Sequence, residues 1–106
     1  MPGMDIARLL KTIEGFEWDK WNIEKNWKKH RVSQKESEQV FFNLSRIVIK
    51  AKRQSRTEKR YLLLGKTTNR RELSVIFTIR NKTIRVISAR PMSRKERRIY
   101  AQAEKV

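Results

Sequence analysis

The chain of 106 residues contains no cysteine and a single histidine, His30. A disulfide and a zinc site built on thiolates are therefore excluded, and so is a metal site that needs several imidazoles. The apolar runs reach only four or five residues, which is too short to span a bilayer. The stretch from Ile6 to Leu10 is interrupted by Arg8 and is too short for the apolar region of a secretory signal. We expect a cytoplasmic protein that needs no cofactor and no metal ion.

Negative charge is also scarce, because 11 Asp and Glu stand against 27 Lys and Arg, for a net charge of +16. Residues 1–38 are nearly balanced, with 8 basic and 7 acidic residues, whereas residues 39–106 hold 19 basic and 4 acidic ones. Such an uneven cationic surface is typical of proteins that bind nucleic acid or an acidic protein partner. The length indicates a single domain over residues 1–106, with a small core, because only 38% of the residues are hydrophobic.

Hydrophobic spacing and capping residues predict the elements. We expect a leading helix over residues 4–14, a strand over 16–19 and two helices over 20–30 and 33–42. Four strands over 46–50, 60–65, 73–79 and 83–89 follow, and a final helix covers 93–104. Asp19 is placed to cap the helix over 20–30. Ser33 with Glu36, and Ser93 with Glu96, have the S-x-x-E spacing of a capping box that opens a helix.

The connections between the last three strands are of hairpin length, which favours antiparallel pairing. The prediction is an α+β domain of order β-α-α-β-β-β-β-α, with a small antiparallel sheet, two helices packed on one face of it and a C-terminal helix. The leading helix within residues 1–15 is treated as an extension of this domain. The cations are expected on the other face of the sheet or at one of its ends.

Two separated segments resemble the signatures of one family. The first comprises Phe16-Glu17-Trp18-Asp19, Asn26, Lys29-His30, Val32-Ser33 and Glu36. The second comprises Ile87-Ser88-Ala89-Arg90, Arg94, Glu96-Arg97 and Tyr100. Together they resemble the BrnT family of type II toxins, and Arg60-Tyr61 and Gly65 are similar to its middle strand. The likeness covers about residues 16–101.

The resemblance implies a fold similar to RelE and a ribonuclease activity that arrests translation. It also implies a cognate BrnA antitoxin of the ribbon-helix-helix type, through which the complex binds operator DNA. Two positions depart from the family pattern. Arg31 stands where a glycine is usual, so the preceding helix is expected to end differently, since a left-handed cap is unfavourable for arginine. Asn22 replaces a lysine that is common in the family.

RNA is cut without a metal when its 2′-hydroxyl attacks the adjacent phosphorus, provided that the charge on the phosphorane oxygens is stabilised and protons are moved. The planar, permanently charged guanidinium suits the first task. The candidate catalytic residues are Arg90, Arg94, Glu96, Arg97 and His30. The candidate RNA-binding residues are Lys29, Arg60, Arg85, Lys52, Arg53 and Tyr100, of which Lys52 and Arg53 lie in a basic loop before residue 60.

Several of these residues have a structural alternative. Arg90 either holds a phosphate or is a solvated strand-end charge, and Glu96 is either the general base or the N3 residue of a cap. His30 is either the general acid or a packed residue on one helix face with Trp27. Tyr100 either stacks on a base or closes the core.

Among the tryptophans, Trp18 and Trp27 are expected in the core and Trp21 at the surface.

Two further functions stay open, a non-catalytic RNA- or ribosome-binding protein and an inactive toxin homologue that acts as a co-repressor.

Overall fold

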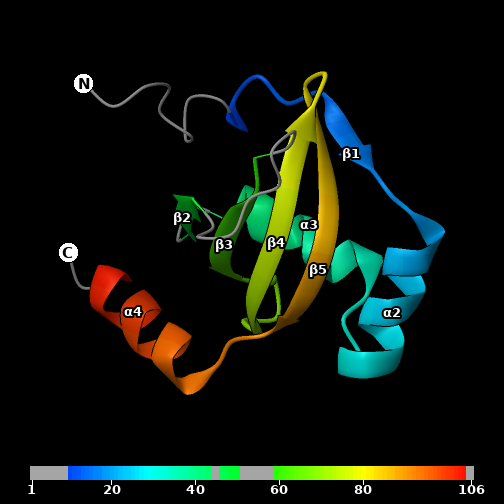
Figure 1. The fold of residues 1–106 in the computed structure, drawn as a ribbon. Coiled ribbons are helices and arrows are strands. Elements are labelled where there is room, and N and C mark those ends of the chain that lie inside the picture. Colours follow the sequence, from blue (N-terminus) through cyan, green and yellow to red (C-terminus); the bar gives the residue numbers. More distant parts are fainter. Residues whose placement is uncertain (1–9, 44–45, 51–58, 105–106) are drawn as a thin grey trace.

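A computed structural model describes residues 10–43, 46–50 and 59–104 (Figure 1). Its elements are β1 (Gly15–Glu17), α2 (Lys20–His30), α3 (Gln34–Phe42), β2 (Arg46–Lys50), β3 (Tyr61–Lys66), β4 (Glu72–Arg80), β5 (Thr83–Pro91) and α4 (Arg94–Glu104). This order is the predicted one. The predicted leading helix over 4–14 lies for the most part outside the described residues. None of the described helices is both long and apolar enough to cross a membrane.

The strands form one mixed sheet in the order β1-β5-β4-β3-β2. Strands β2 to β5 pair antiparallel, as their short connections predict, but β1 pairs parallel with β5, with Gly15 opposite Thr83. The prediction of an antiparallel sheet is therefore wrong for its first strand. Antiparallel pairing was inferred from hairpin length, and β1 reaches β5 without a hairpin, so nothing local determines its direction.

Side chains close the N-termini of the helices as predicted. The carboxylate of Asp19 accepts a hydrogen bond of 2.8 Å from the N–H of Trp21, and Ser33 and Glu36 form a complete capping box. Arg31 ends α2 in the left-handed conformation, with φ of 53°. Its N–H bonds to the carbonyl of Trp27 at 2.8 Å, and the N–H of Val32 bonds to the carbonyl of Asn26 at 3.3 Å. The expectation of a different helix end is wrong, because arginine here adopts the conformation that glycine usually supplies.

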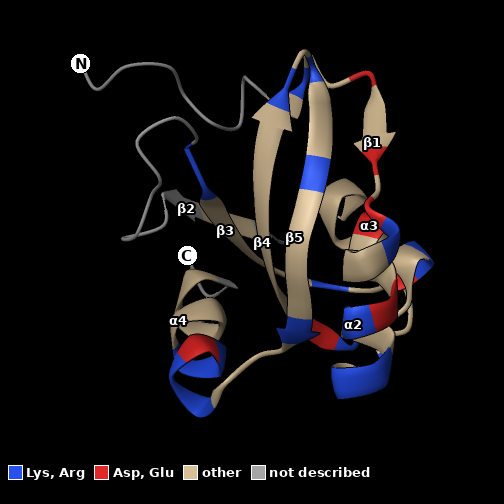
Figure 2. Cartoon of the chain, turned by 45° about the vertical axis from the view of Figure 1, so that its right-hand side comes forward, with Lys and Arg blue, Asp and Glu red and all other residues tan. Residues whose placement is uncertain are grey.

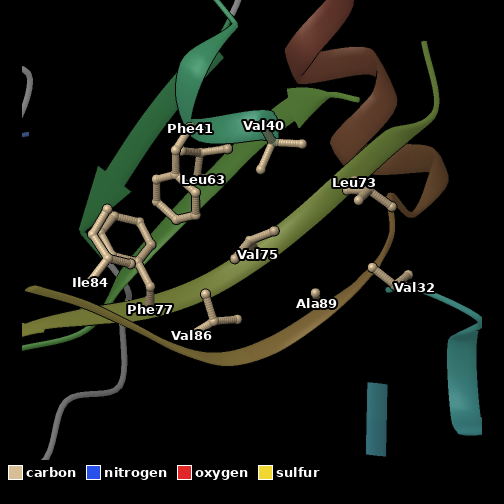
Figure 3. Close-up of a cluster of buried hydrophobic side chains, with 10 residues drawn as sticks. All are labelled: Val32, Val40, Phe41, Leu63, Leu73, Val75, Phe77, Ile84, Val86 and Ala89. Carbon is tan, nitrogen blue, oxygen red and sulfur yellow. The ribbon is translucent and has the colours of Figure 1, made fainter. Parts of the chain in front are cut away.

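The two faces of the sheet carry separate hydrophobic clusters, because successive strand residues point to opposite sides. One face packs against α3 through a cluster of buried residues: Val32, Val40, Phe41, Leu63, Leu73, Val75, Phe77, Ile84, Val86 and Ala89 (Figure 3). On the other face Leu64 contacts Met92 and Tyr100, the last of which lies in α4. The expectation that the helices pack on one face of the sheet is therefore wrong for α4, which covers the face opposite α3 (Figure 1).

Helix α2 closes the edge of β5 that β1 leaves open. Beyond Arg85, where the pairing with β1 ends, three side chains of α2 bond to the backbone of β5. Asn22 donates to Val86 O at 3.3 Å and Lys25 to Ile87 O at 3.1 Å, while Asn26 accepts from the N–H of Ala89 at 3.2 Å. These contacts take the place of a neighbouring strand, because an unpaired edge leaves backbone groups without partners.

Candidate functional site

The junction between β5 and α4 brings together most of the predicted catalytic residues. Arg90 lies next to the last residue of β5, opposite Ser74 at the start of β4. The N–H of Met92 bonds to the carbonyl of Glu72 at 3.1 Å, which fixes the chain where it leaves the sheet. Helix α4 then begins at Arg94. The end of β5 and the first turn of α4 thus lie at the same end of the sheet (Figure 1).

Arg90 is held in place by Glu96 from the first turn of α4. Its Nη1 donates to Oε1 at 2.7 Å and its Nη2 to Oε2 at 2.9 Å, a bidentate ion pair, and Nη1 also donates to the carbonyl of Pro91 at 3.1 Å. The Arg90 side chain nevertheless stays 37% exposed. Within the described part of the chain, no group accepts a hydrogen bond from its Nε. Glu96 therefore fixes one edge of the guanidinium, while the Nε bonds to no described group.

Glu96 serves as the N3 residue of the predicted capping box. Its Oε1 accepts from the N–H of Ser93 at 2.8 Å, and the hydroxyl of Ser93 accepts from the N–H of Glu96 at 3.2 Å. The hydroxyl of Ser74 adds a bond of 3.2 Å to Oε2. Burial alone would raise the pKa of Glu96, but the bonds from Arg90 and Ser93, with the charge of Arg90, lower this pKa to about 2. An ionised carboxylate with so many donors is a poor base, so the geometry favours the cap and a positioning role for Arg90.

The lowered pKa of Glu96 predicts a loss of stability in acid. The contribution is fully present above the ordinary value of 4.5 and is lost as the pH falls towards about 2, because the unfolded chain binds the proton first. We expect the free energy of unfolding of the wild type to exceed that of Glu96→Gln by about 2 kcal/mol at neutral pH, and the difference to vanish near pH 2. Urea unfolding across this range measures both values, with Glu17→Gln at the end of β1 as the exposed control. A constant difference would contradict the assignment.

Two further predicted arginines lie at the same junction. Arg94 is exposed at the first residue of α4, and the Nε of Arg97 lies 3.7 Å from Oε1 of Glu72, with 54% of the Arg97 side chain exposed. Figure 2 shows basic residues gathered on the first turns of α4. Arg94 and Arg97 thus add exposed positive charge to the helix turn whose Glu96 holds Arg90.

The remaining predicted residues are more dispersed. Arg85 lies further up β5 and its Nη2 is 3.8 Å from a carboxylate oxygen of Asp19. Arg60 is half-buried just before β3, and Lys29 is exposed near the end of α2. Lys52 and Arg53 lie outside the described residues. These cations are spread over different parts of the surface.

Of the two alternatives for Tyr100, the structure shows the one in which it closes the core. Tyr100 is fully buried, and the ammonium of Lys66 lies 5.5 Å from its ring centroid, so the interpretation of this ring as an RNA-stacking group is wrong. It closes the core because its position in α4 faces the sheet. His30 is half-buried at the last residue of α2, at the same end of the sheet as Arg90.

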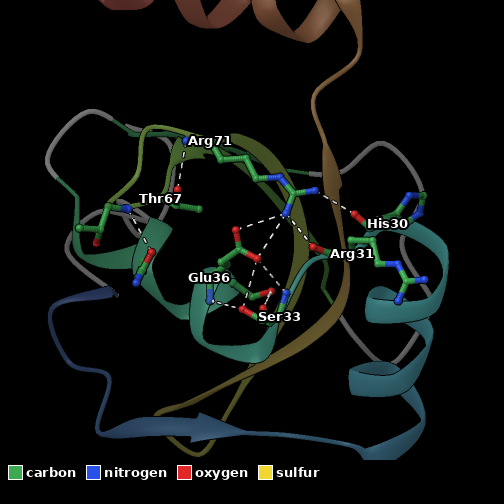
Figure 4. Close-up of polar contacts among 9 residues, drawn as sticks. His30, Arg31, Ser33, Glu36, Thr67 and Arg71 are labelled. Carbon is green, nitrogen blue, oxygen red and sulfur yellow. Dashed lines mark hydrogen bonds and ion pairs between the residues drawn. The ribbon is translucent and has the colours of Figure 1, made fainter.

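A second arginine–glutamate network, which the sequence did not reveal, lies at the same end of the sheet (Figure 4). Arg71 donates to the carbonyl of Arg31 at 2.7 Å and to that of His30 at 2.8 Å, and its Nη1 lies 3.2 Å from a Glu36 oxygen. Burial raises the pKa of Glu36, but the backbone N–H of Ser33 and the bonds from Arg71 outweigh it and lower the pKa. The sequence offered one sign of this network, the capping box of Ser33 and Glu36, because a carboxylate that caps a helix can still accept a hydrogen bond from a further donor.

The tryptophans differ in part from the prediction. Trp18 packs against the core and donates from Nε1 to Glu38 at 2.7 Å, as expected, and Trp21 is 70% exposed, also as expected. Trp27 was expected in the core but is 47% exposed, with the Cζ of Arg31 at 5.3 Å from its ring centroid. Helical spacing placed Trp27 and His30 on the buried face of α2. In the structure Asn26 is the buried residue of this helix, so the neighbouring Trp27 is turned towards the surface.

No group of three or more His, Asp or Glu side chains suited to holding a metal ion lies among residues 10–43, 46–50 and 59–104. The carboxylates of the two networks are instead engaged by guanidinium groups.

Comparisons with known proteins agree with this picture. Residues 18–96 match the model of a family described as the ribonuclease toxin, BrnT, of type II toxin–antitoxin systems. Among solved structures, the Brucella abortus ribonuclease toxin BrnT is similar, with a TM-score of 0.57 and 23% sequence identity. The match covers 76% of this chain and 97% of that one, and it shows a shared fold. No curated protein sequence matches.

Proposed function

This chain belongs to the BrnT family of ribonuclease toxins of type II toxin–antitoxin systems, and we propose that it is an endoribonuclease that cuts RNA in the cytoplasm without a metal ion. The single observation that carries the proposal is the state of Arg90. Glu96 fixes two of its nitrogens, while Nε has no partner among the described residues and the side chain is 37% exposed. A guanidinium oriented in this way is prepared to bind a phosphate without first having to be ordered.

In the proposed reaction the 2′-hydroxyl of a ribose attacks the adjacent phosphorus and releases its proton to solvent. The bond to the 5′-oxygen breaks, and the products are a 2′,3′-cyclic phosphate and a 5′-hydroxyl. Arg90 stabilises the negative charge that develops on the phosphorane oxygens, and Arg94 and Arg97 add to the positive field at the same junction. We assign to His30 the protonation of the leaving 5′-oxygen, because it is the only imidazole in the chain.

The dispersed cations suit a separate task, the binding of the RNA backbone. Lys29, Arg60 and Arg85, together with Lys52 and Arg53, carry no sequence-specific contact in this proposal and neutralise phosphates. We further propose that the cleavage arrests translation and that a ribbon-helix-helix antitoxin similar to BrnA neutralises the toxin. Acidic segments of such an antitoxin are expected to compete with RNA for the same cations, and the complex is expected to reach operator DNA through the antitoxin.

Purified protein incubated with total RNA in the presence of EDTA tests this function. We expect RNA fragments that end in a cyclic phosphate, because the nucleophile is part of the substrate and the charge is stabilised by arginine. The antitoxin should suppress the fragments when it is added in equal amount. RNA that migrates more slowly but stays intact would contradict the enzyme and would support the RNA-binding alternative. Cleavage that stops in EDTA and returns with magnesium would contradict the metal-free mechanism.

A further inference from the structure

The end of α2 carries an aromatic side chain and a guanidinium that the proposed reaction does not use. Trp27 is 47% exposed, although a large indole is normally buried in a small domain, and the Cζ of Arg31 lies 5.3 Å from its ring centroid. No described side chain from the core covers the pair. The two residues lie one helical turn apart, so the helix itself brings them together. An exposed indole beside a cation is the arrangement on which nucleobases stack.

The conformation of Arg31 shows that the position is unfavourable for the backbone. Its φ of 53° and ψ of 38° are left-handed values that glycine adopts without penalty and arginine does not. The chain contains only three glycines and places none of them at this helix end. Strain of this kind persists where the surrounding structure holds the residue in place. The side chain of Arg31, which glycine would lack, is the part that lies over Trp27.

Arg71 is the group that holds this segment. It bonds to the carbonyls of both Arg31 and His30, and Glu36 fixes it in turn (Figure 4). The backbone that carries Arg31 is therefore rigid before any ligand arrives, so binding would not require it to be ordered. Figure 4 shows the Arg31 guanidinium directed away from Arg71, on the outer side of the loop.

The pair also lies at the same end of the sheet as the proposed cleavage site. Asn26, the residue before Trp27, accepts a hydrogen bond from the N–H of Ala89, the residue before Arg90. A strand of RNA whose phosphate contacts Arg90 can thus extend along α2. The exposed residues Lys28 and Lys29 beside the pair supply charge for the backbone of such a strand.

We propose that Trp27 and Arg31 form a stacking platform for one unpaired base of the RNA substrate, next to the scissile phosphate. The inference rests on the proposed function, since it assigns a second binding position for the same substrate. The platform selects single-stranded RNA, because a base within a duplex has both faces covered. The indole supplies the stacking surface, and the guanidinium adds a second planar face and a charge.

The test measures binding of a short, single-stranded 2′-O-methyl RNA, which lacks the nucleophile and cannot be cut. Trp27→Leu is expected to weaken binding roughly 5-fold or more, whereas Trp21→Leu, at the more exposed indole, changes it less than about 2-fold. RNA should quench tryptophan fluorescence in the wild type and in Trp21→Leu but not in Trp27→Leu. Equal effects of the two tryptophan variants would overturn the platform.

Arg31 is tested through a variant that separates backbone strain from binding. Arg31→Gly is expected to have a melting temperature no lower than that of the wild type, because it removes the left-handed penalty, and yet to bind RNA more weakly. Its loss must exceed that of Lys28→Ala, which removes one exposed charge from the same helix. Equal losses in these two variants would mean that only charge matters and would overturn the stacking role.

The outcomes also separate the platform from the proposed function. If the wild type cuts RNA and Trp27→Leu binds the uncleavable RNA normally, the platform fails and the ribonuclease stands. If binding depends on Trp27 but total RNA stays intact, the enzyme assignment fails and the platform stands. A Trp27→Leu variant that binds RNA normally but escapes neutralisation by the antitoxin would overturn the platform and assign the pair to a protein interface.

Discussion

Replacing Arg90 with alanine should lower the rate of RNA cleavage by a factor on the order of 100 to 1000. The variant removes a guanidinium that Glu96 holds through both Nη atoms and whose side chain stays 37% exposed. Such a preorganised donor stabilises the phosphorane more than the ground-state phosphate, so its loss appears mainly in the rate of the chemical step. The measurement is single-turnover cleavage of a labelled RNA at a temperature well below the melting temperature of the variant.

Because Arg90 also neutralises the partly buried carboxylate of Glu96, its loss affects stability as well, and the two effects need separate controls. Arg90→Lys keeps a positive charge near Glu96 but has no planar fork, so we expect it to fold nearly as well as the wild type and still to cut RNA slowly. Arg98→Ala removes one exposed charge from α4 and is expected to cleave at close to the wild-type rate. An Arg90→Ala protein that is folded and as active as the wild type would remove this residue from the site.

Replacing Arg71 with alanine should instead destabilise the fold, by about 2 kcal/mol, since hydrogen bonds to charged groups contribute more than neutral ones. The variant leaves the carbonyls of His30 and Arg31 without their donor and removes the ion pair to Glu36. For a domain of this size the melting temperature should fall by roughly 10 °C. Thermal unfolding followed by circular dichroism measures the change.

Lys35→Ala serves as the matched control for Arg71, because it removes an exposed positive charge from α3 that makes no side-chain hydrogen bond or ion pair to any described residue. We expect its stability to stay within about 0.5 kcal/mol of the wild type. If Arg71→Ala were equally neutral, the hydrogen bonds to the two carbonyls would not be stabilising. At low temperature, where Arg71→Ala is still folded, weaker RNA binding than in Lys35→Ala would connect this residue to the platform that it holds.

The two arginines show why similar local patterns lead to different roles. Each glutamate is the N3 residue of a capping box and pairs with a guanidinium, from Arg71 just before β4 or from Arg90 near the end of β5. Arg71 donates from both Nη atoms to backbone carbonyls at the end of α2 and so joins two separate segments, which is a structural role. Among the described residues, Arg90 donates only to Glu96 and to the carbonyl of the neighbouring Pro91, so it ties down no distant backbone and is the one we assign to the substrate.

Most of the element order was predictable, because its signals are local. Asp19, Ser33 and Ser93 mark helix starts by their own side chains, and the short connections between β3, β4 and β5 make antiparallel neighbours. The position of Arg90 at a strand end was also predictable, since Pro91 and Met92 separate the strand from the helix that Ser93 caps. The assignments that failed concern residues whose neighbours are distant in the sequence. The helical spacing of Trp27 fits burial and exposure equally well, and the indole expected in the core is 47% exposed.

By itself, the sequence determined the composition of the surface, the succession of strands and helices, and the family resemblance, all of which depend on residues a few positions apart. Only the tertiary structure decided that β1 runs parallel to β5, that α4 covers the second face, and that Arg71 bonds to a carbonyl 41 residues away. The physical reason is that caps and turns are stabilised within one stretch of backbone. The partner of a guanidinium or an indole, in contrast, depends on which distant surfaces the hydrophobic cores bring together.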